Sequence, residues 1–120
     1  MMKQTLIGSV ILAAVAAGPA WCAENIERGA GAGSCAAFAE AYAANPVTAE
    51  AVYFSWAQGF MTGANIAAAS ASHRYSDLGG VAKDQQARIR AFCAAHPAGP
   101  YAEAVFDLYK SLPEKSLGSN

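Results

Sequence analysis

A long run without charge in the middle of the chain most strongly limits what this sequence can fold into. From Ala51 to His73 there is no aspartate, glutamate, lysine or arginine. Between Ala49 and Ala69, polar residues recur at intervals of three and four, the spacing of one helix face; they are Ser55, Gln58, Thr62 and Asn65. At about 100° per residue, the broad opposite side holds Val52, Tyr53, Trp56, Phe60, Gly63 and Ala64. The pattern predicts a nearly buried helix with one polar, uncharged stripe.

Two glycines, Gly59 and Gly63, lie on the apolar side of this predicted helix. A glycine inside a helix costs up to about 1 kcal/mol relative to alanine, so we expect another helix backbone to approach closely there. Glycines at this spacing also occur in membrane helix pairs, but Gln58 and Asn65 disfavour a membrane span. If both glycines faced solvent, a dimer interface would explain them better.

The first 22 residues are typical of a secretory signal peptide. Lys3 supplies a positive charge, and Leu6 to Ala17 form an apolar stretch of the usual length. This stretch is too short to predict a membrane span. We expect cleavage after Cys22, with Ala20 and Ala23 as alternative cleavage positions, and therefore a periplasmic or secreted protein.

The three cysteines indicate one disulfide bond. Cys22 leaves with the signal peptide, and bulky Trp21 disfavours lipidation of Cys22 because a small residue is needed just before a lipidated cysteine. Cys35 and Cys93 then remain as the sole pair in an oxidising compartment. Two buried free thiols are the alternative.

The rest of the chain predicts three more helices, and no alternating strand pattern is found. Ser34 can cap a helix that ends near Asn45, before Pro46. A third helix runs from Ala82 or Asp84 to His96, and a fourth from about Pro100 to Leu112, with Thr48 expected to cap the central one. We therefore predict an all-α, four-helix bundle-like domain over 34–113, in which the disulfide links the first and third helices. Residues 23–33 are expected to be a flexible N-terminus, Ser70 to Gly80 a loop or frayed helix end, and 114–120 a loose tail.

No catalytic, cofactor-binding or metal-binding residue is predicted. His96 suits a helix C-terminus better than a metal site, since no second histidine lies at ligand spacing. The polar stripe is a candidate contact for a peptide or small ligand, although such groups more often satisfy one another. His73, Arg74 and Tyr75 in the predicted loop are further candidate contacts, and an exposed linker is the alternative interpretation.

The charge balance argues against nucleic acid as a partner. The chain has nine acidic and eight basic residues, and Lys3 leaves with the signal peptide. Binding to phosphates needs a clustered basic surface. A protein partner is expected instead, without stable membrane insertion of the mature chain and with an oligomeric state that the sequence leaves open.

Several short segments resemble two groups of small exported bacterial helical proteins. They are Ser34-Cys35 with Phe38, WAQGFMTGAN (56–65), IRAFCAAHP (89–97) and AVFDLY (104–109). One group is the HdeA-like proteins, which are periplasmic chaperones that open in acid and hold unfolded clients. The other is the type VI secretion amidase immunity (Tai-type) proteins, which share a cysteine-linked helical layout and block one toxin. The resemblance covers about Ser34 to Leu112 and carries over no functional residue beyond Cys35 and Cys93.

Together these features predict a periplasmic, non-enzymatic protein-binding module. An HdeA-like stress chaperone is the first expectation, although nine acidic residues are a modest supply for opening in acid. The alternatives are an immunity protein that binds a secreted amidase toxin and a small-ligand carrier that uses the polar stripe.

Overall fold

The computed structural model describes residues 26–118. Four helices make up most of this part, in agreement with the predicted all-α fold, and two short strands and one 3-10 helix complete it. The elements are η2 (Ala30–Ala32), α1 (Cys35–Ala44), α2 (Pro46–Ser72), β1 (Arg74–Ser76), α3 (Ala82–Ala95), α4 (Tyr101–Ser111) and β2 (Glu114–Ser116). The predicted signal peptide, residues 1–22, lies outside the described residues.

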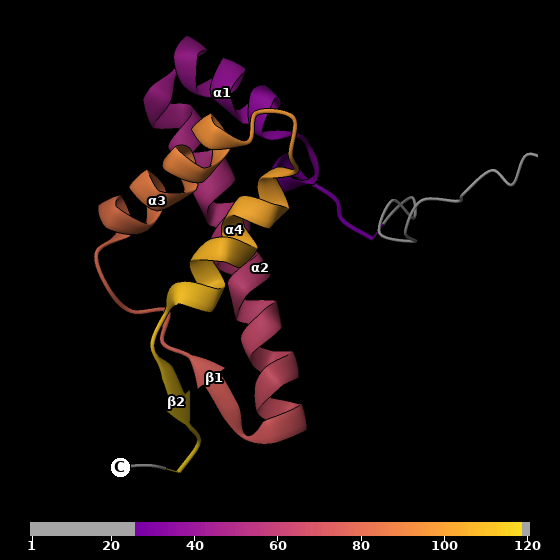
Figure 1. Cartoon of the computed structure of the whole chain (residues 1–120), viewed down its shortest axis with the longest axis vertical. Helices are drawn as coiled ribbons and strands as arrows, with labels where there is room; N and C mark the ends of the chain where they lie inside the picture. The colour runs from indigo at the N-terminus through magenta and orange to yellow at the C-terminus, as the bar shows by residue number, and fades with distance from the viewer. Residues whose placement is uncertain (1–25, 119–120) are drawn as a thin grey trace, which may run out of the picture.

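The long helix α2 organises the molecule (Figure 1). Helices α1 and α3 lie near one end of α2, the two strands lie near the other end, and α4 crosses it between them. In the part of the chain that the structure describes, no helix combines the length and apolar character needed to cross a membrane.

Helix α2 extends beyond the predicted range at both ends. It begins one turn earlier than expected because Asn45 caps it, with Oδ1 accepting a hydrogen bond from the Thr48 N–H at 3.0 Å. Pro46 occupies the first helical position, where its missing N–H costs nothing. The prediction that Thr48 is the cap is therefore wrong. The helix ends at Ser72, and His73 caps it in a left-handed conformation with φ 57°.

Helix α1 has the predicted start and end. Ser34 Oγ accepts a hydrogen bond from the Ala37 N–H at 3.1 Å, and Cys35 and Phe38 face the core. The N–H groups of Cys35 and Ala36, in the first turn, have no acceptor within the helix. They donate to the carbonyls of Gly99 and Pro97 in the α3–α4 loop, at 2.8 and 2.9 Å. The start of α1 is thus joined to the loop that follows α3.

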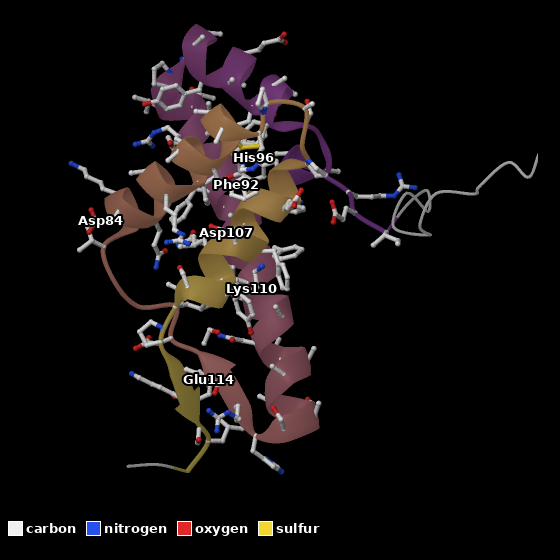
Figure 2. All side chains as sticks on the ribbon, viewed as in Figure 1. Asp84, Phe92, His96, Asp107, Lys110 and Glu114 are labelled. Atoms are coloured by element: carbon white, nitrogen blue, oxygen red, sulfur yellow. A yellow bond between two sulfur atoms is a disulfide. The ribbon has the colours of Figure 1, made fainter. Side chains whose placement is uncertain are left out.

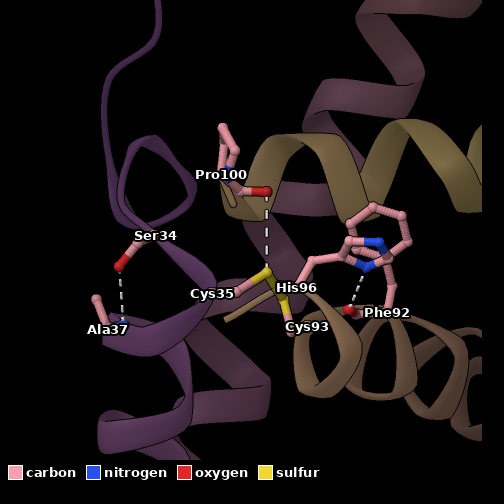
Figure 3. The surroundings of a disulfide bond; sticks show 7 residues. All are labelled: Ser34, Cys35, Ala37, Phe92, Cys93, His96 and Pro100. Atoms are coloured by element: carbon pink, nitrogen blue, oxygen red, sulfur yellow. Dashed lines mark hydrogen bonds between the residues drawn. A yellow bond between two sulfur atoms is a disulfide. The ribbon is translucent and has the colours of Figure 1, made fainter. Parts of the chain in front are cut away.

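The disulfide Cys35–Cys93 is formed beside this contact (Figure 3). It links the first turn of α1 to the last part of α3 across 58 residues of sequence, with a Cα–Cα distance of 4.9 Å. Both cysteines are buried, at 1% and 5% exposure. This confirms the predicted bridge between the first and third helices.

The core lies where the four helices meet. Its buried side chains are Cys35, Phe38, Phe54, Ala57, Met61, Ile89, Cys93, Tyr101, Ala104, Val105 and Leu108. One face of α4 enters this core, since Tyr101, Ala104, Val105 and Leu108 are all buried and Leu112 is half-buried. Aromatic rings join the helices, as where Phe38 of α1 meets Tyr101 edge-on at 5.0 Å between ring centroids.

All three chain segments expected to lack regular structure carry short elements. The glycine-rich segment forms η2 and is fixed against Trp56, because a Cβ at Gly31 would lie only 2.0 Å from the indole ring. Trp56 Nε1 also donates to the Arg28 carbonyl at 2.7 Å. At the other end, β2 pairs antiparallel with β1, with Tyr75 opposite Lys115. Residues 70–80 therefore contain the end of α2, which fits the predicted frayed helix end, and strand β1, which was not predicted.

Candidate functional site

The predicted polar stripe of α2 does not form one surface. The Ser55 and Thr62 hydroxyls donate to carbonyls of their own helix, those of Ala51 and Gln58, at 2.6 and 2.7 Å. Such bonds to the preceding turn satisfy a hydroxyl without a ligand. Ser55, Gln58 and Thr62 are exposed, whereas Asn65 is half-buried against other elements. The stripe therefore consists of three exposed residues and of Asn65, which contacts other elements.

Asn65 connects α2 to β1 and α4. Its Nδ2 donates to the Ser76 carbonyl and its Oδ1 accepts from the Ser76 N–H, both at 2.8 Å. The Tyr109 hydroxyl donates to the same Oδ1 at 2.9 Å. A carbonyl only accepts and an N–H only donates, so Ser76 fixes the orientation of the amide.

The side of α2 that faces solvent is different from the predicted one. Phe54, Ala57 and Met61 are buried, whereas Val52 and Ile66 are 50% and 64% exposed. We call the solvent side the outer face of α2, and it consists of Thr48, Val52, Ser55, Gly59, Thr62, Gly63, Ile66 and Ser70.

Gly59 and Gly63 lie on this outer face, and none of the helices within residues 26–118 approaches them. A Cβ placed on either glycine meets nothing within 4 Å. The prediction of close backbone approach within the chain is therefore wrong. The uncharged sequence gave no marker of the solvent side, because small residues occur all around α2.

A cleft of about 420 Å³ adjoins the outer face near its middle. Trp56 and Phe60 stack there at 5.4 Å between ring centroids, and both are half-buried. The other lining residues are Ile26, Glu27, Arg28, Ser55 and Gly59. The cleft thus has an aromatic wall from α2 and a wall from the N-terminal segment.

A second hollow lies where α2, the sheet and α4 meet, and we call it the sheet-end hollow. It measures about 320 Å³ and is lined by Ala68, Ser72, Arg74, Tyr75, Ser76, Tyr109, Lys110, Leu112 and Glu114. Two of the three residues predicted from the loop, Arg74 and Tyr75, line it, whereas His73 does not. Sequence reasoning missed Tyr109 and Lys110, which come from α4; in Figure 2, Lys110 lies near the end of that helix and Glu114 on β2.

Charged side chains hold the sheet beside this hollow. Arg74 of β1 forms an ion pair with Glu114 of β2, and Lys115 Nζ lies 2.6 Å from Asp77 Oδ2. The Lys115 ammonium and the Gly79 N–H hold the pKa of the Asp77 carboxyl below its ordinary value of 3.8. Hydrogen bonding to Asp77 likewise raises the pKa of Lys115 above its ordinary value of 10.5. Both strands are therefore tied by exposed ion pairs as well as by backbone bonds.

His96 has the structural position that the sequence favours. Its ring stacks on Phe92 at 4.3 Å between centroids, and its Nδ1 lies 3.0 Å from the Phe92 carbonyl (Figures 2 and 3). Within residues 26–118, no three histidine, cysteine or acidic side chains gather where they could hold a metal ion.

No family model, curated protein or solved structure matches this chain. The resemblance to HdeA-like and Tai-type proteins therefore stays a prediction.

Proposed function

We propose that this protein is an exported, non-enzymatic module that binds one folded protein partner at the sheet-end hollow. The observation that carries the proposal is the convergence of two tyrosines and two basic side chains from β1 and α4, namely Arg74, Tyr75, Tyr109 and Lys110. Tyrosine and arginine are enriched among the residues that dominate protein interfaces, since they join a large apolar area to a polar end.

The charges of the hollow favour an acidic group on the partner. Arg74 is paired with Glu114, but the Arg74 side chain remains 55% exposed. Lys110 extends over the Phe106 ring, with Nζ 4.9 Å from the centroid, and is also exposed. Two basic groups thus border the hollow against one carboxylate. We propose that a carboxylate or a backbone carbonyl of the partner lies between them.

The fixed positions of β1 and α4 beside the hollow support recognition of one partner. Asn65 holds both Ser76 and Tyr109, so β1 and α4 are fixed relative to α2. A surface that is already ordered loses little conformational entropy on binding. Blocking a single protein, as in the immunity role, requires such a surface and no chemistry from the module itself.

The chaperone role has separate support in the distribution of ion pairs. Besides the two in the sheet, Arg90 of α3 pairs with Glu50 of α2, and Arg88 of α3 lies 3.0 Å from Asp107 of α4. These pairs join elements that are far apart in sequence, and ion pairs of this kind are what acid denaturation generally disrupts. Under the chaperone role, an apolar-surface dye binds reversibly as the pH falls from 7 to 2; under the immunity role, it does not.

Co-purification from the exported fraction tests the proposal. We expect one stoichiometric protein partner. Tyr75→Ala should weaken its binding by about 30-fold, as expected of a central interface residue, and Lys110→Glu should slow association about tenfold. The control is Lys83→Glu, the same charge reversal at an exposed position of α3. Absence of a stoichiometric partner, or equal binding by all variants, would rule out this function.

A further inference from the structure

Contacts within the described part of the chain do not explain the residues found on the outer face of α2. Glycine is the least favourable residue in a helix interior after proline, and this helix has two glycines with open space beside them. Val52 and Ile66 are exposed on the same face, at 50% and 64%. Stability of the single chain therefore does not account for the small and apolar residues found here.

The spacing along this face is that of one helix packed against another. Thr48, Val52, Ser55, Gly59, Thr62 and Ile66 follow one another at intervals of four and three residues, which is the seven-residue repeat of paired helices. This seam has a length of about 27 Å, at 1.5 Å per residue. Glycine in its middle lets a second helix backbone come close.

The order of residues on the face is nearly the same in both directions from Gly59. Val52 and Ile66 lie seven residues on either side, and both are branched and apolar. Ser55 and Gly63 lie four residues away and are both small, and Thr48 and Ser70 lie eleven away and both carry a hydroxyl. In an antiparallel helix pair with a twofold axis at Gly59, Val52 of one copy therefore faces Ile66 of the other. A symmetric dimer requires such self-complementarity.

The absence of charge on the outer face also favours a second copy of the same face as its partner. No charged residue lies on α2 beyond Glu50, so a partner with charged groups would lose their hydration without compensation. The other helices have charged residues on their exposed sides, such as Glu40, Lys83 and Glu103.

We propose that two copies of this chain form a dimer through the outer face of α2, with antiparallel helices and the twofold axis at Gly59. The sheet-end hollow uses Ala68 and Ser72 and none of the outer-face residues, so each copy keeps its hollow free. The seam is short relative to interfaces of about 800 Å² per partner, and we expect a dissociation constant on the order of 10 µM.

Sedimentation equilibrium of the exported, disulfide-bonded protein tests the association. The test variant is Gly59→Glu, which has open space in the single chain and a better helix former, so the fold is retained and resists urea at least as well. Two like charges would meet at the axis of the dimer, and we expect the affinity to fall at least 100-fold. The control is Ala87→Glu on the exposed side of α3, which should leave the dimer unchanged.

Disulfide cross-linking under a mild oxidant tests the geometry. In the proposed dimer the two copies of Gly59→Cys are adjacent, whereas the two copies of Ser70→Cys lie about 33 Å apart along the helices. We expect a cross-linked dimer from the first variant only. Equal cross-linking at both positions would indicate parallel helices and overturn the proposal. A wild type that stays monomeric at 300 µM, or a Gly59→Glu variant that still dimerises, would also overturn the proposal. A monomer that binds a different protein through the outer face would overturn it as well. The Tyr75→Ala variant distinguishes this proposal from the proposed function. We expect it to lose the partner of the sheet-end hollow and still to form the dimer.

Discussion

Asn65 is the residue on which the shape of the sheet-end hollow depends most. One amide makes three hydrogen bonds, two with the backbone of Ser76 and one with the Tyr109 hydroxyl. These bonds join three elements that are far apart in sequence. Each such bond contributes about 1 kcal/mol net, and more is lost when a partner is left unsatisfied.

Asn65→Ala should lower the free energy of unfolding by about 2–3 kcal/mol, because three hydrogen bonds are lost at a half-buried position. Urea denaturation followed by circular dichroism measures this change. Asn65→Asp keeps both accepted bonds and should cost less. The matched control is Gln58→Ala on the exposed side of the same helix, with an expected change below about 0.5 kcal/mol. Equal stability of Asn65→Ala and Gln58→Ala would contradict the assigned role.

The spacing of the polar residues placed Asn65 correctly on α2 but not its partners. At about 100° per residue, the four polar residues cover roughly 80° of the helix surface. Asn65 lies at the edge of this arc that meets β1 and α4, so it is half-buried while Ser55 and Thr62 are exposed. Contacts with residues 11 and 44 positions away leave no local sequence signal.

At the scale of elements, strand β2 is held by few and exposed contacts. All three of its residues are exposed, and two ion pairs connect it to the segment around β1. Two backbone hydrogen bonds flank these ion pairs. The Asp77 N–H donates to the Pro113 carbonyl at 2.7 Å, and the Leu117 N–H donates to the His73 carbonyl at 2.8 Å. We therefore expect this strand to open at lower free energy than the helical core.

The Asp77–Lys115 pair should make the attachment of β2 depend on pH. The folded-state pKa of Asp77 lies below 3.8, so its contribution is complete above that value and is lost as the pH falls through the lowered pKa. The pKa of Lys115 lies above 10.5, so its contribution is complete below 10.5 and is lost as the pH rises through the raised pKa.

Hydrogen exchange of the Asp77 and Leu117 amides measures this dependence. Both amides should be best protected between these limits, once the intrinsic effect of pH on exchange is removed. Asp77→Asn should lower protection at neutral pH and remove the acid-dependent loss. Asp84→Asn, at an exposed position of α3, is the control. Protection of the two amides that does not respond to Asp77→Asn would show that the backbone bonds alone hold the strand.

Prolines and caps predicted the ends of α1, α3 and α4 well because they act locally, whereas both ends of α2 were placed inside the helix. Ser34 and Asn45 bound α1, Pro97 follows α3 closely, and Pro100 precedes α4. The strands were missed since three-residue segments show no periodicity. The buried side of α2 was predicted only in part, because alanine, glycine and serine occur on both its buried and its exposed sides.

For the molecule as a whole, the disulfide is the strongest single constraint. The bridge closes a 58-residue separation in a domain with a small core. It also keeps the start of α1 against the α3–α4 loop, where the N–H groups of Cys35 and Ala36 find their acceptors. A chain of this size has limited apolar area to bury, so the bridge carries a large share of the net stability.

Replacing both bridge cysteines, as Cys35→Ala with Cys93→Ala, should lower the free energy of unfolding by about 4 kcal/mol, from the added freedom of the unfolded chain. Urea denaturation of the variant against the oxidised wild type measures the loss. The wild type reduced with dithiothreitol should approach the variant. A loss below about 1 kcal/mol would show that helix packing alone maintains the fold.

The packing of η2 on Trp56 makes the fluorescence of this residue a reporter of the N-terminal segment. The sequence has two tryptophans, Trp21 and Trp56, and the first falls within the predicted signal peptide. The indole of Trp56 is covered on one side by Gly31 and donates a hydrogen bond through Nε1 to the Arg28 carbonyl. Release of the N-terminal segment would expose it to water and move its emission to longer wavelength. Opening of the aromatic cleft could then be followed in the unlabelled protein.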